Sequence, residues 1–135
     1  MYNCTMDIVI DASSILAVLL NEPERDSIIA SSKGTRLLAP ESIPCEIGNA
    51  VSALIRRKSI TIAQGVSVYH GFSGIPIRFV PIDFPEAIRI TGEENLYAYD
   101  AYVLQVAQSF KIPLMTLDRR LAAAATRRDL DLMEV

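Results

Sequence analysis

The chain alternates short apolar runs with longer stretches of helical pattern, and this alternation limits its fold more than any other feature. Ile8, Val9 and Ile10 form a short, β-branched run that is typical of a strand buried on both faces of a parallel sheet. Similar runs predict strands at residues 37–39, 77–82 and 114–117, and residues 130–135 favour a closing strand. The sequence therefore predicts a mostly parallel sheet of four to five strands.

Helical patterns fill the segments between these runs. In residues 41–58 the apolar positions Ile47, Ala50, Val51 and Leu54 follow the spacing of one helix face. Further helices are expected at residues 14–20, 23–32, 61–72, 85–92, 97–110 and 119–127. Strands that alternate with helices imply right-handed crossovers, so the predicted fold is an α/β sandwich with helices on both faces of the sheet.

Length and composition predict one domain over residues 1–135, since 135 residues is an ordinary domain size and half of them are apolar. The net charge of −3 argues against a protein that coats nucleic acid without specificity, although a local basic patch remains compatible with phosphate binding. Cys4 and Cys45 form no metal-binding motif, so reduced thiols are expected. The N-terminus has no signal-peptide pattern and no run long enough for a membrane span, which predicts a cytoplasmic protein.

Two aspartates follow predicted strands directly. Asp11 comes after the first strand and Asp118 after the fourth, and each begins a predicted helix. In open α/β sheets, ligands bind at the carboxyl ends of the strands. Helix capping is the simpler explanation for either aspartate taken alone.

Two further acids lie on helices. Asp100 lies on the same helix face as the apolar residues Val103 and Leu104. The helix dipole favours an aspartate near the helix start, but it does not explain why this aspartate lies on the apolar face. Glu46 and Asn49 are three residues apart and flank an apolar stripe, where a solvated edge is as good an explanation as function.

Taken together, the four acids favour a metal site. Carboxylates that meet in space repel one another unless a cation lies between them. Oxygen ligands suit Mg²⁺ or Mn²⁺ better than zinc, and such sites are typical of phosphoryl chemistry on nucleic acids. A histidine-based nucleophile system is disfavoured because His70, the single histidine, is expected on the surface. The chain also lacks a Walker A loop and a GxGxxG motif.

Four segments resemble the PIN-domain ribonucleases, and within them the VapC-type toxins of toxin–antitoxin pairs. In chain order they are VIDASSIL, APESIPCEIGNAVSALIRR, YAYDAYVLQVA and PLMTLDRRL. The resemblance implies a PIN-like three-layer sandwich whose acidic metal cluster consists of Asp11, Glu46, Asp100 and Asp118. It assigns supporting roles to Ser13, Asn49 and Thr116. Glu41 is a rival to Glu46, but it lacks an asparagine three residues later.

By the same resemblance the substrate is RNA, cut within the strand. Basic residues that could hold its backbone are Arg119, Arg120, Arg56, Arg57 and Lys58, whereas a structural role is at least as good an explanation for Arg127 and Arg128. The resemblance also implies a homodimer, a cognate antitoxin protein as partner and no membrane association. Glu93 and Glu94 are expected to be solvated, although they could add a fifth acid near Asp100.

Two alternatives stay open at this point. One is a non-catalytic PIN-fold module that binds RNA or protein, although such a module would normally have lost one of the acids. The other is a housekeeping RNA-processing or DNA-cutting nuclease. The sequence alone does not identify the RNA, its cleavage site, the antitoxin or the number of metal ions.

Overall fold

A four-stranded parallel sheet forms the centre of the protein, in a computed structural model of the chain that describes residues 5–135. The strands lie in the order β3-β2-β1-β4, with bounds β1 Asp7–Ile10, β2 Arg36–Pro40, β3 Ile77–Val80 and β4 Leu114–Met115. In the register, Leu38 of β2 pairs with Val9 of β1 and with Arg78 of β3. Because every pair is parallel, all four strands end at the same edge of the sheet.

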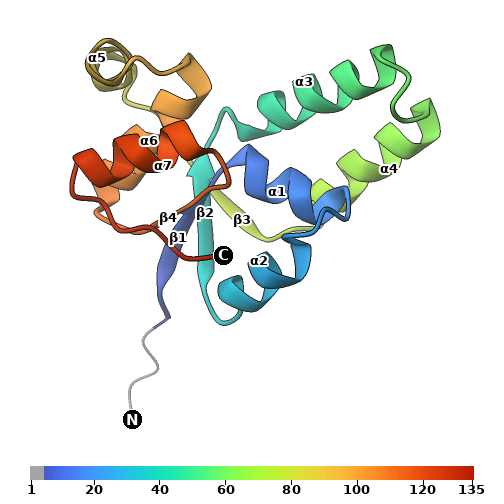
Figure 1. Cartoon of the computed structure of the whole chain (residues 1–135), viewed down its shortest axis with the longest axis horizontal. Coiled ribbons are helices and arrows are strands. Elements are labelled where there is room, and N and C mark those ends of the chain that lie inside the picture. Colours follow the sequence, from blue (N-terminus) through green and yellow to red (C-terminus); the bar gives the residue numbers. More distant parts are fainter. Residues whose placement is uncertain (1–4) are drawn as a thin grey trace.

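Seven helices within residues 5–135 cover the two faces of this sheet. They are α1 Ala12–Leu19, α2 Arg25–Ser32, α3 Ile43–Arg56, α4 Ile62–Ser73, α5 Phe84–Glu94, α6 Ala98–Phe110 and α7 Arg119–Arg127. Figure 1 shows α5, α6 and α7 on one side of the sheet and α1 and α2 on the other, with α3 and α4 extending beyond them. The predicted α/β three-layer sandwich is confirmed.

The strand order explains why there are three layers. The chain runs from β1 to β2 to β3 in one direction and then returns across the sheet to place β4 on the far side of β1. Right-handed crossovers that run in opposite directions put their helices on opposite faces. The order therefore reverses between β1 and β4, and this is the point where open α/β sheets bind ligands.

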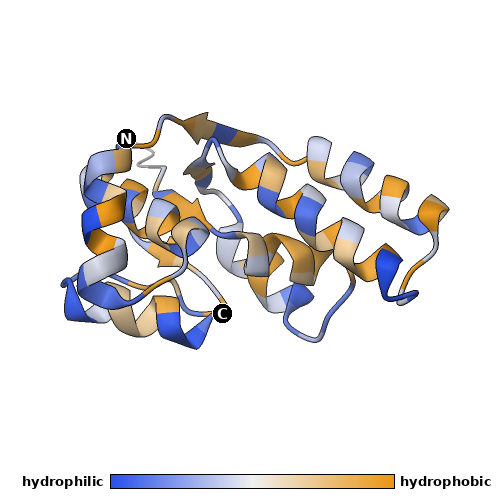
Figure 2. Cartoon of the chain, turned by 90° about the horizontal axis from the view of Figure 1, so that it is seen from above, coloured by the Kyte–Doolittle hydropathy of each residue, from blue (hydrophilic) through white to orange (hydrophobic). Residues whose placement is uncertain are grey.

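The core lies between the sheet and both helix layers. Ile8, Val9 and Leu114 of the sheet are fully buried, as the apolar runs predicted. Leu104 of α6 and Ile47 of α3 are also fully buried and belong to the same hydrophobic core. Figure 2 shows α3 and α4 side by side, with hydrophobic and hydrophilic residues interspersed along both helices.

Among residues 5–135, no helix combines the length and the hydrophobicity that a membrane span requires.

Two predicted strands are shorter than expected, and each has a physical reason. The third strand ends at Val80 rather than residue 82 because Pro81 has no N–H to donate to the sheet. The fourth ends at Met115 rather than residue 117 because the N–H of Leu117 donates to Ser13 Oγ instead of to a neighbouring strand. In both cases the chain leaves the sheet at the edge where all four strands end.

The predicted closing strand at residues 130–135 is wrong. Within the described residues this segment makes a single β-bridge, between Leu132 and Leu114, and no continuous strand. His70 is exposed on α4, as expected, and Cys45 is an exposed free thiol. Cys4, for which a reduced thiol was also predicted, lies outside the described residues.

Candidate metal centre

Asp11 lies at the carboxyl end of β1, where it begins α1. Its Oδ1 accepts a hydrogen bond of 3.0 Å from the Ser14 N–H, so the predicted helix-capping role is confirmed. Ser13 Oγ lies 2.8 Å from each carboxylate oxygen, and Thr116 Oγ1 donates to Oδ2. With 4% of its surface exposed, Asp11 is a buried carboxylate that several donors hold in one orientation.

The two hydroxyl groups beside Asp11 are themselves fixed by backbone groups. Ser13 Oγ accepts from the N–H of Leu117 and Thr116 Oγ1 accepts from the N–H of Asp118, each at 3.0 Å. A hydroxyl that accepts from the backbone must point its proton elsewhere, and here that is toward Asp11. The loop after β4 therefore aligns Ser13 and Thr116 on the carboxylate at the end of β1.

Asp118 lies in the same loop and caps α7. Its Oδ1 accepts from the N–H groups of Arg120 at 2.9 Å and Leu121 at 3.0 Å, which confirms the capping role predicted for it. These two bonds use one carboxylate oxygen. Asp11 and Asp118 follow β1 and β4, the two strands between which the sheet order reverses.

Glu46 and Asp100 reach the same region from two helices, α3 and α6. Burial raises the pKa of Glu46 to about 7, and the negative charges of Asp11 and Asp100 contribute to this rise. Burial also raises the pKa of Asp100 to about 6, with contributions from Asp118 and Asp11, against the opposing effect of Arg120. Glu46 therefore lies near Asp11 and Asp100, and Asp100 lies near Asp118 and Asp11.

Burial likewise raises the pKa of Asp11, although hydrogen bonds from Thr116, from the Ser14 N–H and from the Ser13 hydroxyl oppose it. For these three acids, burial and neighbouring negative charges outweigh the hydrogen bonds and the positive charge that favour ionisation. The structure thus brings together the four acids that the sequence singled out, from four separate elements.

The donor set fits a hard divalent cation. Carboxylate and hydroxyl oxygens are the ligands that Mg²⁺ and Mn²⁺ prefer. Within residues 5–135, however, no group of three or more Asp, Glu, His or Cys side chains is arranged so that it could hold a metal ion. Mg²⁺ sites in phosphoryl-transfer enzymes commonly use one or two carboxylates and retain several waters, so an open cluster of this kind remains suitable.

The other residues predicted for the site differ in whether they contact the acids or only face solvent. Asn49 is exposed on α3, and its side chain is in none of the hydrogen bonds found among residues 5–135. Arg119 and Arg120 are exposed at the start of α7, and Arg120 Nη2 donates to the Asn95 carbonyl at 3.0 Å. The effect of Arg120 on Asp100 places this arginine beside the acids. Glu41, the rival to Glu46, is exposed before α3 begins.

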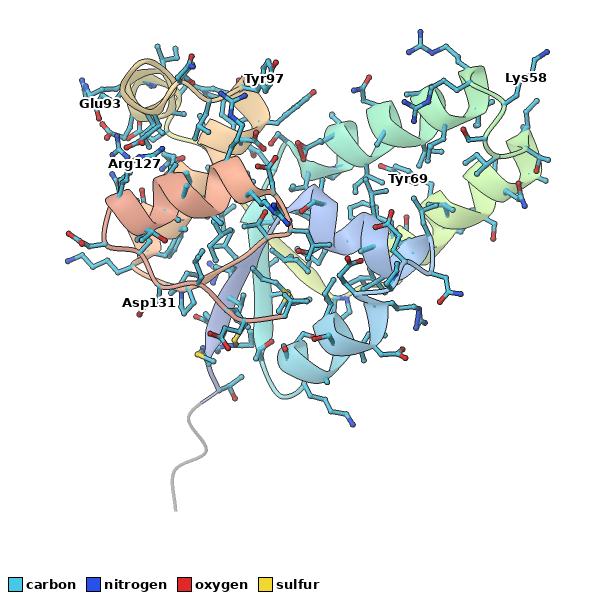
Figure 3. The ribbon with its side chains drawn as sticks, viewed as in Figure 1. Lys58, Tyr69, Glu93, Tyr97, Arg127 and Asp131 are labelled. Atoms are coloured by element: carbon cyan, nitrogen blue, oxygen red, sulfur yellow. The ribbon has the colours of Figure 1, made fainter. Side chains whose placement is uncertain are left out.

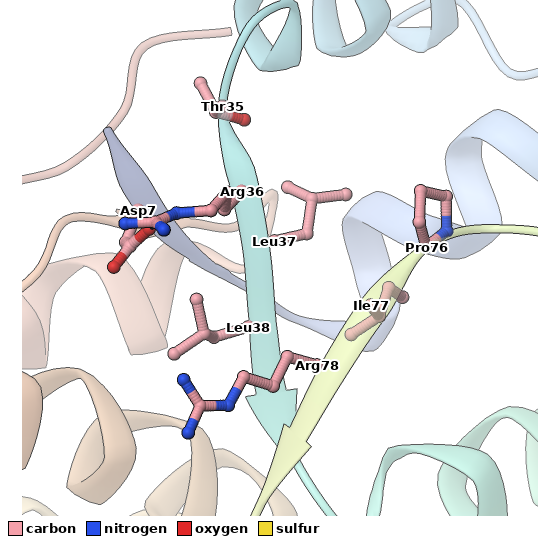
Figure 4. A pocket seen from close by; sticks show the side chains of 8 residues that line it. All are labelled: Asp7, Thr35, Arg36, Leu37, Leu38, Pro76, Ile77 and Arg78. Atoms are coloured by element: carbon pink, nitrogen blue, oxygen red, sulfur yellow. The ribbon is translucent and has the colours of Figure 1, made fainter. Parts of the chain in front are cut away.

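The three basic residues of the α3 end divide into two groups. Arg57, which is exposed like the other two, lines a groove of about 350 Å³ together with Ser13 and Leu117, and none of the four acids lines that groove. Arg56 and Lys58 are exposed, and Figure 3 shows Lys58 at the outer end of the α3–α4 pair. A separate cavity of about 560 Å³ is lined by Asp7, Arg36 and Ile77 at the starts of the strands, at the end of the sheet opposite to the acids (Figure 4).

The sequence did not reveal the role of Ser14 beside Asp11, and the expectation for Glu94 was wrong. Ser14 is fully buried, and its N–H and hydroxyl bind Asp11 and the Met115 carbonyl. The Asp-x-x-Ser spacing of a capped helix could have revealed it. Glu94 was expected to be solvated or to join the acids, but it forms ion pairs with Arg127 and Arg128 instead.

Comparison with known proteins identifies the family. The PIN domain family model matches residues 8–127, so this chain belongs to the PIN domain family and the resemblance found in the sequence is confirmed. A VapC ribonuclease of Mycobacterium bovis is 31% identical over 117 residues, which cover 85% of this chain and 88% of the relative. Ribonuclease VapC12 of Mycobacterium tuberculosis is 28% identical over 116 residues, with coverage of 85% and 89%.

Solved structures agree on the fold. The crystal structure of PAE2754 from Pyrobaculum aerophilum matches with a TM-score of 0.71 at 24% identity, covering 88% of this chain and 79% of that one. That of VapC20 from Mycobacterium tuberculosis, described as a sarcin-ricin loop cleaving toxin, matches with a TM-score of 0.63 at 15% identity, covering 87% and 94%.

Proposed function

We propose that this chain is a Mg²⁺- or Mn²⁺-dependent endoribonuclease that acts as the toxin of a toxin–antitoxin pair. The observation that carries the proposal is the cluster of four acids at the point where the sheet order reverses, where burial and then neighbouring carboxylates raise the pKa of Glu46 and of Asp100. The VapC ribonucleases that resemble the chain over most of its length support the same activity.

Each acid has a role that follows from its surroundings. Asp11 is the most buried of the four and is held by Ser13, Ser14 and Thr116, so it serves as a fixed ligand. Glu46 and Asp100 complete the negative site from the helices, and Asp118 presents a carboxylate while it caps α7. A divalent cation, when bound, supplies positive charge against the charge that develops on the phosphate during hydrolysis.

Charge next to the cluster suits an anionic substrate. Arg119 and Arg120 are exposed beside the acids, and Arg57 lines the groove that leads to Ser13. Phosphate contacts of this kind position a nucleic acid without reading its sequence.

The proposal includes a cognate antitoxin, a homodimer and a cytoplasmic location. An antitoxin partner is supported by fold neighbours crystallised as toxin–antitoxin assemblies, such as VapBC2 of Rickettsia felis, which has a TM-score of 0.64 at 14% identity. A genetic test is direct: expression of this chain should arrest growth, and co-expression of the neighbouring small gene should restore it.

Cleavage by the purified full chain tests the activity. We expect cutting of single-stranded RNA with Mg²⁺ or Mn²⁺, no cutting with excess chelator, and recovery when the metal is restored. Single-stranded DNA of the same sequence should resist, which separates this activity from a DNA-cutting nuclease. RNA binding without any cleavage under these conditions would instead identify a non-catalytic module and overturn the proposal.

A further inference from the structure

Several aromatic side chains lie around the start of α6, the helix that carries Asp100. Tyr97 directly precedes α6, Tyr99 lies in its first turn beside Asp100, and Tyr102 follows one turn later. Phe84, the first residue of α5, packs against Tyr102. We refer to Phe84, Tyr97, Tyr99 and Tyr102 as the aromatic surface.

The rings of this surface differ in how they are held. Phe84 and Tyr102 meet edge to face with ring centroids 5.4 Å apart, and Tyr99 and Tyr102 meet in the same way at 6.0 Å. This packing fixes the ring of Tyr99 while 36% of the residue stays exposed. Tyr97 is 77% exposed and is in none of the ring pairs found among residues 5–135.

The position of the surface connects it to the candidate site. Figure 3 shows Tyr97 at the end of the molecule where the strands terminate, on the loop between α5 and α6. Arg120, two residues after Asp118, donates to the carbonyl of Asn95 in this same loop at 3.0 Å. The exposed rings of Tyr97 and Tyr99 therefore lie at the helix start that carries Asp100, and Arg120 contacts the loop that leads into it.

This combination favours unpaired nucleotides over other ligands. Bases that are free of a duplex stack on exposed aromatic rings, while arginines bind the neighbouring phosphates. A paired base offers no free face, so a duplex would gain nothing from these rings. An exposed Tyr ring that is already oriented loses little conformational freedom when a base stacks on it.

We propose that Tyr97 and Tyr99 form a stacking platform for an unpaired base next to the phosphate that is cut. Phe84 and Tyr102 act as positioning residues that hold the Tyr99 ring. The proposal rests on the endoribonuclease function proposed above, because it assumes that the substrate lies across the acids.

Binding in the presence of chelator tests the platform separately from cleavage. The probe is a short fluorescent RNA without internal pairing, and its affinity is measured by anisotropy. Tyr97→Leu and Tyr99→Leu should each weaken binding about 5- to 150-fold, the equivalent of 1–3 kcal/mol for one stacked base. Tyr97→Phe and Tyr99→Phe should bind like the wild type, because they keep the ring.

Phe110→Leu is the matched control. Phe110 is the last residue of the same helix and is 47% exposed, but it lies at the end of α6 remote from Asp100. Its replacement should leave RNA affinity unchanged. Equal losses for Phe110→Leu and Tyr99→Leu would indicate a general effect of removing exposed rings and would overturn the proposal.

Abasic substitution identifies the stacked base. Removal of one base of the RNA should weaken binding to the wild type, and the same removal should have no further effect on Tyr97→Leu or Tyr99→Leu. If the Leu variants bind every RNA like the wild type, or change only the oligomeric state in size-exclusion chromatography, the aromatic surface is not an RNA site. If the wild type binds through the tyrosines but cuts nothing with Mg²⁺ or Mn²⁺, the proposed activity fails while the platform stands.

Discussion

Two clusters of charged side chains lie at opposite ends of α6 and α7, and they differ in whether their charges are balanced. The cluster at the strand ends consists of Asp11, Glu46, Asp100 and Asp118. The other joins the end of α5 to the end of α7 through Glu93, Glu94, Arg127 and Arg128. Figure 3 shows Glu93 and Arg127 close together in this second cluster.

The second cluster neutralises itself. Arg127 Nε lies 2.8 Å from one oxygen of Glu94 and Arg128 Nε lies 3.0 Å from the other. The hydrogen bond from Arg127, followed by its charge and the contacts from Arg128, keeps the pKa of Glu94 below its ordinary value. At the strand ends the pKa values move in the opposite direction. The comparison indicates that the second cluster connects helices through paired charges, whereas the acids at the strand ends have no such ion pairs within residues 5–135.

Loss of a strand-end acid should have the largest effect. Asp11→Asn removes a charge but keeps the shape, and we expect cleavage of RNA to fall at least about 100-fold, because the bound metal supplies several kcal/mol of charge stabilisation. The measurement is kcat/KM on a labelled RNA. Asp26→Asn, at an aspartate whose side chain is fully exposed on α2, should cut at the wild-type rate. Full activity of Asp11→Asn would remove this acid from the site.

Loss of an arginine from the second cluster should affect stability instead. Arg128→Ala leaves Glu93 and Glu94 without this partner and should lower the free energy of unfolding by about 1–3 kcal/mol, measured by urea denaturation. Arg89→Ala, which breaks an exposed pair with Glu86, should cost less than about 1 kcal/mol. If Arg128→Ala unfolded at the same urea concentration as the wild type but no longer cut RNA, the second cluster would have a role in activity rather than in stability.

The hydroxyl groups beside Asp11 should matter less than the acid itself. Thr116→Val keeps the size of the side chain and removes the hydrogen bond to Oδ2, so we expect kcat/KM for RNA to fall about tenfold, the equivalent of about 1.4 kcal/mol. Thr126→Val on α7, whose hydroxyl donates to a carbonyl of its own helix, is the matched control. Similar rates for both variants would show that Asp11 needs no alignment by Thr116.

The smallest effect concerns pH. The pKa values of Glu46 and Asp100, about 7 and about 6 in the fold, lie above their ordinary values of 4.5 and 3.8. Their protonation therefore favours the folded metal-free protein at acid pH, and this contribution is lost as the pH rises through 6 and 7. Both side chains are partly exposed, so we expect a fall of about 1 kcal/mol in unfolding free energy.

Thermal unfolding in chelator, followed from acid to mildly alkaline pH, measures this fall. Glu46→Gln should flatten the profile, and Mg²⁺ should restore stability on the alkaline side, where the acids are ionised. A metal-free protein that becomes more stable as the pH rises through 6 and 7 would show that the acids do not repel one another.

Much of the fold follows from local sequence. The β-branched run at Ile8 and Val9 and the apolar stripe of α3 are visible in the chain, and their elements lie where they were predicted. The errors concern segments whose ends depend on distant partners. Leu117 leaves the sheet because Ser13, more than a hundred residues earlier, accepts its N–H.

The sequence singled out the four acids of the candidate site, but it did not predict their arrangement in space. Asp11 and Asp118 could be placed at strand ends from the sequence, but the strand order that brings β1 beside β4 could not be derived from local patterns. Asn49 shows the limit of spacing arguments, since it follows Glu46 by one turn yet is exposed. Hydrogen bonds that cross from Thr116 to Asp11 also require the folded chain.

Calorimetric titration of the metal-free protein with Mn²⁺ at neutral pH tests the central claim most directly, because it needs neither the right RNA nor the antitoxin. The account predicts saturable binding to the wild type and to Asp26→Asn, and at least about tenfold weaker binding to Asp100→Asn. Absence of Mn²⁺ binding to the folded wild type, or equal affinity for Asp100→Asn, would contradict it.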